Sequence, residues 1–336
     1  MSEQHPHRAT ILPVPEGIPR PFWSVMIPTY NCGNYLRETL ASVLAQDPGA
    51  DIMQIEVVDD YSTKDNPEAV VREIAGDRVT FYRHPENVGY IKNFNTCLQR
   101  SRGQLVHLLH GDDCVRDGFY QKMQHGFDKN PQIGAAFCRH IFIDHDSHWQ
   151  NISSLEETKS SILNNWLERI AVKQLIQAPS IVVKRSVYEK LGGFDSRMSC
   201  YGEDWEMWVR IAAQYPCWYE TEPLALYRKS LTSLTGTSTR TGKNIQDFRK
   251  AINIVNEYLE TERANKLKRI ALKNYSYYAL GSAKNFVAKG DAYGAINQVR
   301  EAFLCNFSLI VASYSLKLSF DFLLKMVTKI AWTKTN

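Results

Sequence analysis

The sequence Leu105-Val106-His107-Leu108-Leu109-His110-Gly111-Asp112-Asp113-Cys114 is a short apolar run that ends in two adjacent carboxylates. The run is typical of a buried strand, and two like charges at the end of such a strand cost free energy unless a cation lies nearby. Divalent metal ions prefer oxygen ligands and accompany phosphates in many proteins. The stretch therefore predicts a buried strand that carries Asp112 and Asp113 to a site for a metal ion and a phosphate.

The composition is that of an ordinary globular protein. The chain has 336 residues, of which 44% are hydrophobic and 23% charged, so we expect one large domain with an appendage, or two domains. The net charge of +4 is too small to indicate a nucleic-acid partner. The seven cysteines are widely spaced, which favours reduced thiols, no structural zinc and a cytoplasmic protein. Neither a secretory signal nor a transmembrane helix is predicted.

Strands and helices alternate along the chain up to the opening stretch. Apolar runs and helical spacing predict strands at residues 22–27, 55–58, 79–83 and 105–109, and helices at residues 34–46, 67–75 and 90–100. This alternation is typical of a parallel α/β sheet, in which ligands bind at the carboxyl ends of the strands. Polar clusters fall at those ends: Thr29-Tyr30-Asn31, Asp59-Asp60, Asn87 and Asp112-Asp113. Together the four clusters predict one ligand site along this edge of the sheet.

The pattern becomes less regular after the opening stretch. It predicts a helix at 118–129, strands at 133–138, 140–143, 178–185 and 224–228, a short helix capped by Ser186, and a helix from 202 to 210. Residues 144–161 are polar and predict a mobile loop. Residues 231–241 are rich in Ser, Thr and Gly, which predicts a linker or a flexible flap.

Both ends of the chain are expected to lie outside the sheet domain, which we place at residues 22–235. Residues 1–21 are Pro-rich without periodicity and predict a flexible leader, whereas residues 236–336 predict helices. In the last helix, Lys317, Asp321, Lys325 and Lys329 recur on one face of an otherwise apolar segment. This basic amphipathic pattern suits a membrane interface, and a terminal helix packed on the domain explains it equally well.

Six short motifs occur in a fixed order between residues 22 and 235. They are Val25-Met26-Ile27-Pro28-Thr29-Tyr30-Asn31, Val57-Val58-Asp59-Asp60-Tyr61-Ser62-Thr63, Asn87-Val88-Gly89 with Asn93 and Asn95, Gly111-Asp112-Asp113, Lys190-Leu191-Gly192-Gly193-Phe194-Asp195, and Gly202-Glu203-Asp204-Trp205. This region resembles the inverting nucleotide-sugar glycosyltransferases of family 2. The resemblance implies a GT-A fold, which is a mixed, Rossmann-like α/β sheet flanked by helices. The residues beyond 245 form a helical extension that the resemblance does not cover.

The chemistry of sugar transfer agrees with two separate acidic sites. A sugar leaves its nucleoside diphosphate by displacement at the anomeric carbon, and a divalent cation such as Mn²⁺ or Mg²⁺ neutralises the charge that gathers on the leaving group. The acceptor hydroxyl must lose its proton to a base on the opposite side of that carbon. Asp112 and Asp204 suit these two tasks. A single displacement inverts the anomeric centre.

The resemblance also implies roles for named residues. Asp60 corresponds to the acid that accepts a hydrogen bond from the nucleobase, and Asp112 corresponds to the last acid of the family's Asp-x-Asp metal motif. Asp204 corresponds to the general base of the reaction, with Glu203 beside it. Trp205 is expected in an acceptor platform. The remaining donor-site residues implied by the resemblance are Pro28, Thr29, Tyr30, Asn31, Asp59, Asn87, Asn93, His110 and Asp113. A UDP-sugar is the favoured donor, with dTDP- and GDP-sugars as alternatives.

Three positions depart from the family pattern. His110 replaces the first acid of Asp-x-Asp, Tyr61 stands where glycine is frequent, and Lys229-Ser230 follow the last strand where many members carry a metal-binding histidine. These departures predict a reshaped base pocket and either a weakly held metal ion or a diphosphate neutralised by Arg228 or Lys229.

The predicted function is transfer of a sugar to a lipid-linked glycan during surface polysaccharide or O-antigen synthesis, on the cytoplasmic face of the inner membrane. A degenerate family member that acts as a scaffold is the alternative, and the simultaneous presence of Asp60, Asp112 and Asp204 argues against it. A nucleotidyltransferase is less favoured because the turn at residues 28–33 contains no Lys or Arg. Taken singly, Asp60 could be a turn residue and Asp204 a helix-start acid.

Overall fold

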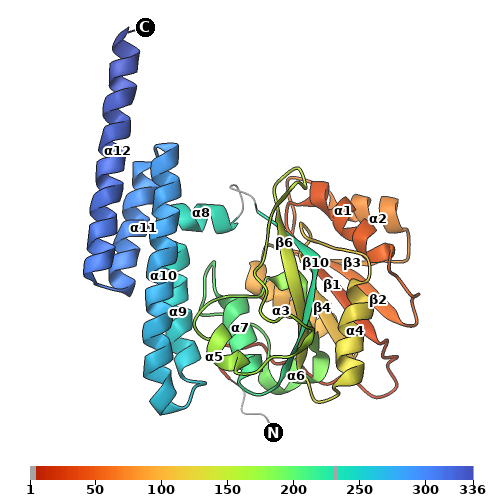
Figure 1. Ribbon diagram of the computed structural model, residues 1–336. Helices are drawn as coiled ribbons and strands as arrows, with labels where there is room; N and C mark the ends of the chain where they lie inside the picture. Colours follow the sequence, from red (N-terminus) through yellow and green to blue (C-terminus); the bar gives the residue numbers. More distant parts are fainter. Residues whose placement is uncertain (1–4, 230–233, 336) are drawn as a thin grey trace. The chain divides into compact units, whose positions relative to one another are not determined.

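The computed structural model of the protein describes residues 5–229 and 234–335, which divide into two compact units (Figure 1). The sheet unit comprises Met1–Leu167, Gln174–Ser196 and Met207–Lys229, and the helical unit comprises Glu168–Lys173, Arg197–Glu206 and Ser230–Asn336. Two internal segments, residues 168–173 and 197–206, thus belong with the C-terminal helices although the sequence placed them in the sheet domain.

The sheet unit is built on one mixed sheet of ten strands. Its strands are β1 (Trp23–Thr29), β2 (Met53–Asp59), β3 (Thr80–Arg83), β4 (Leu105–Leu108), β5 (Cys114–Val115), β6 (Ala135–Ile143), β7 (Trp149–Ile152), β8 (Ser161–Ile162), β9 (Ile181–Lys184) and β10 (Cys217–Arg228). The main order is β3-β2-β1-β4-β9-β6-β10-β5, with β7 added to β6 and β8 to β10. β3, β2, β1 and β4 run parallel, and β9 is antiparallel to β4 and β6. This arrangement confirms the predicted mixed α/β class.

Helices flank this sheet. They are α1 (Gly33–Leu44), α2 (Pro67–Ala75), α3 (Tyr90–Arg100), α4 (Phe119–Lys129) and α6 (Arg185–Leu191), with a short 3₁₀ turn at Ala178–Ser180. Every residue of β1 and β2 is buried, as the strands of a parallel sheet covered on both faces are. α2 begins where the side chain of Asn66 accepts the N–H of Ala69, and α3 begins after Gly89, whose φ is 87°. These local signals explain why both helices were predicted with the bounds that they have.

Several predictions for the second half of the sheet were wrong in their bounds. Residues 133–138 and 140–143 are not two strands, since β6 runs without interruption from Ala135 to Ile143. The predicted mobile loop at 144–161 contains β7 and ends at the start of β8. α6 starts at Arg185, so Ser186 lies inside the helix rather than at its cap. β10 starts at Cys217 instead of Leu224, because its first half pairs with β6 and β8.

Part of the predicted flexible leader, residues 7–12, is attached to the sheet unit. The backbone N–H groups of Gly193 and Ser196 donate to the carbonyls of Ala9 and His7, each at 2.8 Å. Ile11 is only 2% exposed. Residues 7–12 are therefore fastened to the sheet unit by backbone hydrogen bonds and one buried side chain, neither of which requires the periodic pattern that sequence analysis detects.

The helical unit confirms the predicted C-terminal helical region. Its helices are α8 (Leu234–Thr241), α9 (Lys243–Asn256), α10 (Thr261–Lys289), α11 (Ala292–Cys305) and α12 (Leu309–Thr335). α10, α11 and α12 share an apolar core that includes Ala279, Ala283 and Val311. Residues 234–241 were predicted as a linker or flap, but they form α8, and residues 231–233 lie outside the described residues. Over the described ranges, no helix is both long enough and apolar enough to cross a membrane.

Two further helices, α5 (Trp166–Ile170) and α7 (Glu203–Ala212), contain residues of both units.

Candidate functional site

The turns that follow β1 and β2 are joined by hydrogen bonds into one edge. Thr29 and Asp59 are register partners at the ends of the two strands. The side-chain oxygen of Asn31 accepts the backbone N–H groups of Thr63 and Lys64, each at 3.0 Å. Asn31 has a φ of 51°, a left-handed conformation that asparagine tolerates better than most residues. Asn31 therefore connects the first two predicted polar clusters.

The carboxylate of Asp59 is fully buried and is used within its own turn. It accepts the hydroxyl of Ser62 at 2.5 Å and the backbone N–H of Ser62 at 3.0 Å. Arg83 Nε lies 3.6 Å from the same carboxylate, and an Arg83 Nη donates to the carbonyl of Ser62 at 2.6 Å. These bonds fix the shape of the turn after β2. Sequence analysis did not single out Arg83, which sits at the end of β3.

Asp60 connects the second cluster to the third. Its two carboxylate oxygens accept the backbone N–H groups of Val88 at 2.7 Å and of Gly89 at 3.0 Å, next to the start of α3. The side chain of Asn87 donates to the carbonyl of Asp60 at 3.0 Å. Burial raises the pKa of the Asp60 carboxyl, and the two backbone N–H groups oppose that shift. Any contact between Asp60 and a ligand must use the remaining lone pairs of these oxygens.

Two tyrosine rings are exposed on these turns. Tyr30 is 50% exposed and Tyr61 is 40% exposed, whereas Pro28 and Thr29 are buried at the end of β1. Tyr61 has a φ of 62°, which is rare for a bulky residue and, where it occurs, often marks a functional position. The guanidinium of Arg83 lies 5.1 Å from the centre of the Tyr61 ring. These two tyrosines provide the exposed aromatic surface that is available to a nucleobase at this edge.

Asn93 and Asn95 of the third motif lie in α3 and form hydrogen bonds to neighbouring segments. Asn93 donates to the carbonyl of Val58 at 3.0 Å, and its own side-chain oxygen is buried without a partner among the described residues. Asn95 accepts the N–H of Phe194 at 2.7 Å and donates to its carbonyl at 3.2 Å. A Cβ on Gly193 would lie 2.2 Å from the Asn95 oxygen, so only glycine fits there. The hydrogen bonds between Asn95 and Phe194 thus connect the third motif to the fifth.

The turn after β4 gathers three potential metal ligands. One ligand atom from each of His110, Asp112 and Asp113 lies within 4.8 Å of the other two. The His110 ring stacks on Phe94, with ring centres 4.8 Å apart. A Cβ on Gly111 would lie 3.0 Å from the Thr29 hydroxyl, which explains a glycine between the histidine and the acids. The structure therefore brings the predicted fourth cluster together around this turn.

Arg228, at the end of β10, holds this turn in place. Its backbone N–H donates to an Asp113 carboxylate oxygen at 2.8 Å, and its Nε donates to the carbonyl of Asp112 at 2.9 Å. Its Nη2 lies 2.9 Å from a carboxylate oxygen of Glu38. The hypothesis that Arg228 neutralises a diphosphate is therefore unsupported, because its guanidinium already has these partners. Lys229 packs its ammonium 3.6 Å from the centre of the Phe142 ring, and Ser230 lies outside the described residues.

The donor atoms at this turn fit a divalent cation. Burial raises the pKa values of Asp112 and Asp113, and the charge of Asp112 raises that of Asp113 further. Burial lowers the pKa of His110 to about 4, which leaves its imidazole neutral and able to act as a ligand. His110 Nε2 and Asp113 Oδ2 are buried without a hydrogen-bond partner in the described part of the chain. A cation would satisfy both atoms and stabilise the ionised carboxylates.

The predicted base lies in the helical unit, at the start of α7. Glu203 and Asp204 occupy the first turn of this helix, where the helix dipole stabilises negative charge. Asp204 is partly exposed, and one of its carboxylate oxygens accepts the backbone N–H of Trp205 at 2.7 Å. Glu203 is 9% exposed. Of the two acids, Asp204 presents more of its surface to solvent.

Trp205 does not have the surface expected of an acceptor platform. It is fully buried, and its indole N–H donates to the carbonyl of Ile170 at 2.6 Å. Its ring packs edge-on against Phe248 and Tyr275, whose rings stack 4.0 Å apart. These contacts all lie within the helical unit, and they explain why residues 168–173 and 197–206 belong to it. The packing argues against the acceptor role.

Comparison with known proteins gives a family and a fold. Residues 24–192 match the model of the family described as glycosyl transferase family 2. An uncharacterised glycosyltransferase of Rickettsia prowazekii is 24% identical over 238 residues, covering 69% of this chain and 72% of the relative. The O-antigen biosynthesis protein RfbC of Myxococcus xanthus is 24% identical over 57% of this chain, which matches only 16% of RfbC.

Two solved structures share the fold. The S. aureus protein TarS, residues 1–349 in complex with UDP-GlcNAc, matches with a TM-score of 0.64 and 16% identity, over 84% of this chain and 81% of that one. The mannosyltransferase PcManGT of Pyrobaculum calidifontis, in complex with GDP-Man and Mn²⁺, matches with a TM-score of 0.56 and 18% identity, over 98% and 92%.

Proposed function

The chain belongs to glycosyl transferase family 2 and is a glycosyltransferase, and from this premise we propose that it transfers a sugar, with inversion, from a nucleoside-diphosphate donor to a glycan hydroxyl. The observation that carries the proposal is the single edge formed by three turns, which gathers Asn31, Asp60 and the acid pair Asp112-Asp113 after neighbouring parallel strands. Nucleotides bind at this edge in sheets of this kind.

We propose that the nucleobase of the donor binds at the tyrosine-bearing turns. Tyr30 and Tyr61 provide exposed rings for stacking, and Asp60 provides carboxylate lone pairs for a base N–H. Pro28, Thr29 and Asn31 hold the backbone of this edge, and we assign them and Asp59 a supporting role. A UDP-sugar is the favoured donor, in line with the UDP-GlcNAc bound by TarS, and the GDP-Man bound by PcManGT keeps GDP-sugars as an alternative.

We propose that the metal ion binds at the turn after β4. His110, Asp112 and Asp113 would hold it, and an imidazole beside two carboxylates favours Mn²⁺ over Mg²⁺. When bound, such an ion supplies charge neutralisation for a leaving diphosphate. The Mn²⁺ in the complex of PcManGT supports this choice of metal.

Asp204 is proposed as the base that removes the proton from the acceptor hydroxyl. Its partly exposed carboxylate stands on a helix start, where its position is fixed by the bond to the N–H of Trp205. Glu203 is a supporting neighbour. Retention of the family's acid at this position, together with Asp60 and Asp112, argues against a scaffold protein that lacks activity.

A panel of nucleotide sugars tests the proposed function. With Mn²⁺ present and no acceptor, we expect slow hydrolysis of one donor, and we expect the matching nucleotide to raise the melting temperature more than the others do. Chelation with EDTA should abolish hydrolysis, and added Mn²⁺ should restore it. If no UDP-, dTDP- or GDP-sugar is hydrolysed and none shifts the melting temperature, the scaffold alternative replaces the proposal.

The acceptor is proposed to be a lipid-linked glycan, reached on the cytoplasmic face of a membrane during surface polysaccharide synthesis. The similarity to RfbC supports the pathway class. α12 supports the membrane contact, because the side chains of its described part form two apolar faces. Val311 and Leu318 are buried against the unit, whereas Leu309, Leu316, Phe320 and Leu323 are 89%, 72%, 66% and 62% exposed. We call these four exposed residues the α12 stripe.

Charge decides which partner covers the α12 stripe. Residues 230–336 contain sixteen Lys and Arg residues against seven Asp and Glu residues. A second copy of this unit would be repelled by that excess, whereas the anionic surface of a bilayer attracts it. α12 also extends beyond the ends of α10 and α11 (Figure 1). The side chains of Lys325 and Lys329, part of the predicted basic face, lie outside the described residues.

Substitution of the α12 stripe should release the protein from membranes. We expect Leu316→Ser with Phe320→Ser to lower partitioning onto phosphatidylglycerol vesicles at least tenfold, because two large apolar side chains no longer leave water (roughly 1.5–3 kcal/mol each when fully buried). Vesicle co-sedimentation measures the partitioning. The matched control is Ile152→Ser with Leu155→Ser, two exposed apolar residues of the sheet unit. Unchanged binding, or conversion of a wild-type dimer to a monomer, would show that the stripe serves another purpose.

A further inference from the structure

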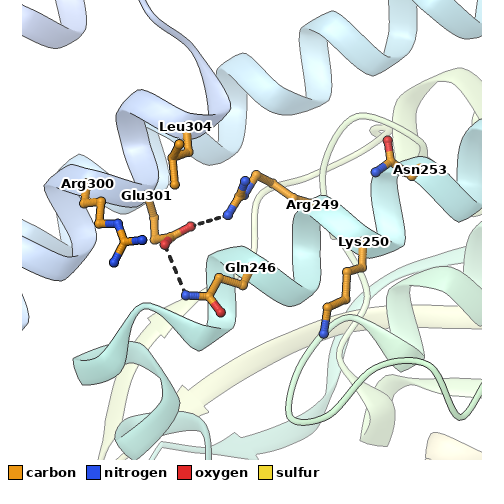
Figure 2. A pocket seen from close by; sticks show the side chains of 7 residues that line it. All are labelled: Gln246, Arg249, Lys250, Asn253, Arg300, Glu301 and Leu304. Atoms are coloured by element: carbon orange, nitrogen blue, oxygen red, sulfur yellow. Dashed lines mark hydrogen bonds and ion pairs between the residues drawn. The ribbon is translucent and has the colours of Figure 1, made fainter.

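A groove of about 410 Å³ lies between α9 and α11 in the helical unit, outside the donor site (Figure 2). Gln246, Arg249, Lys250 and Asn253 line it from α9, and Arg300 and Leu304 line it from α11. The volume is that of a small-molecule site. Three of these six side chains are cationic, so the groove suits an anion.

The one acid among the described residues that line this groove offsets one of its three cations. Glu301 also lines the groove, but it is only 2% exposed. Its carboxylate oxygens are taken by Arg249 Nη2 at 2.6 Å and by Gln246 Nε2 at 3.1 Å, as the dashed lines in Figure 2 show. Its charge therefore faces inward, and its effect is to fix the guanidinium of Arg249 across the groove. A positioned guanidinium loses less freedom when it binds an anion.

Two arginines in the groove have N–H groups without an acceptor among the described residues. Arg249 Nε is buried without a hydrogen-bond partner, and the described residues provide neither an ion pair nor a hydrogen bond for the Arg300 guanidinium. Lys250 is 54% exposed and pairs with Asp247 at 2.9 Å. A buried unpaired N–H of a charged group is costly, and a tetrahedral oxyanion supplies the oxygens that these donors require.

One edge of the groove is apolar. Leu304 is 52% exposed where it lines the groove, and Phe307, two residues beyond the end of α11, is 88% exposed. An ion that is polar on all sides would leave Leu304 in water. A phosphate that carries an apolar chain would cover Leu304 while its oxygens reach the arginines.

We propose that the groove between α9 and α11 binds the phosphate group of an amphiphile, with Arg300 and Arg249 on the phosphate oxygens and Leu304 against the first carbons of the chain. The site adds a second ligand to the proposed function and does not depend on the donor site. A membrane phospholipid and a lipid-linked acceptor both present this chemistry.

Calorimetric titration of the full chain at fixed ionic strength tests the proposal with two probes, inorganic pyrophosphate and dihexanoyl phosphatidic acid below its micellar concentration. We expect Arg300→Gln to weaken both probes about tenfold, as the loss of a charge-assisted contact does. We expect Leu304→Ser to weaken the phosphatidic acid alone. Lys284→Gln is the matched control, since it removes one exposed positive charge from α10, outside the groove.

Equal weakening by Arg300→Gln and Lys284→Gln would overturn the site, because binding would then reflect the net charge of the unit. Failure of both probes to bind the wild-type protein would overturn it as well. The titrations contain no donor, so an error in the proposed function leaves their outcome unchanged. Two vesicle arms assign the source: Arg300-dependent binding to phosphatidylglycerol indicates a membrane phospholipid, and Arg300-dependent binding only to neutral vesicles doped with a long-chain alkyl phosphate indicates the acceptor.

Discussion

Asp204→Asn is expected to lower the kcat of sugar transfer about a thousandfold, the range in which removal of a general base falls. The amide cannot take the proton of the acceptor hydroxyl, although it has nearly the shape of the carboxylate. Because Asp204 is proposed to act on the acceptor hydroxyl and not on the nucleotide, the affinity for the nucleotide should stay within about twofold of wild type. Steady-state transfer assays and nucleotide titration measure the two quantities.

The control for this prediction addresses the simpler interpretation of Asp204 as a helix-start acid. Glu262 occupies the first turn of α10, is exposed and has no proposed catalytic role. Glu262→Gln removes a comparable favourable charge from a helix start, worth about 0.3–1 kcal/mol of stability. It should leave kcat unchanged. If Asp204→Asn keeps more than a tenth of the wild-type kcat while Glu203→Gln loses activity, the base is Glu203.

Asp112→Asn is expected to remove the stimulation of donor hydrolysis by Mn²⁺ and to lower kcat by a factor of about a hundred or more, a typical loss for one electrostatic contact at a reacting centre. The substitution takes a negative charge from a site whose other oxygen ligand is Asp113. The concentration of Mn²⁺ that gives half-maximal nucleotide binding should rise as well. Metal titrations followed by hydrolysis and by melting temperature check both effects.

Asp117→Asn is the matched control for Asp112→Asn, since Asp117 lies five positions later and is exposed. It should behave as wild type in both titrations. An Asp112→Asn variant that keeps its response to Mn²⁺ would place the metal site elsewhere. Asp112→Asn should also raise the melting temperature or leave it unchanged in the absence of metal, because burial already disfavours the ionised carboxyl.

Local sequence signals predicted the first half of the sheet well. The bounds of α2 and α3 were predicted correctly. Asn66 and Pro67 mark the start of α2, and Gly89 marks the start of α3. The alternation of buried strands and helices was sufficient to bring the four polar clusters to one edge. The sequence pattern therefore located the candidate donor site without tertiary information.

Contacts between distant segments account for what sequence analysis missed. The start of β10 at Cys217 depends on pairing with β6 and β8, and the attachment of residues 7–12 depends on backbone bonds to Gly193 and Ser196. Trp205 was predicted to lie in an acceptor platform because the sequence alone does not distinguish an exposed tryptophan from a buried one. One sequence signal pointed to Arg228, a charged residue at the end of an apolar strand. Its six hydrogen-bond partners, however, come from distant segments of the sheet unit.

The attachment of Arg228 to the acid turn has a consequence for the time at which the site matures. Asp113 and the backbone N–H that fixes its carboxylate are 115 positions apart in the chain. During synthesis, the ribosome must add β6, β9 and β10 before Asp112 and Asp113 can reach their final positions. A nascent chain therefore carries the two acids without their anchor while the second half of the sheet unit is translated, and the turn proposed to bind the metal is among the last parts of that unit to be completed.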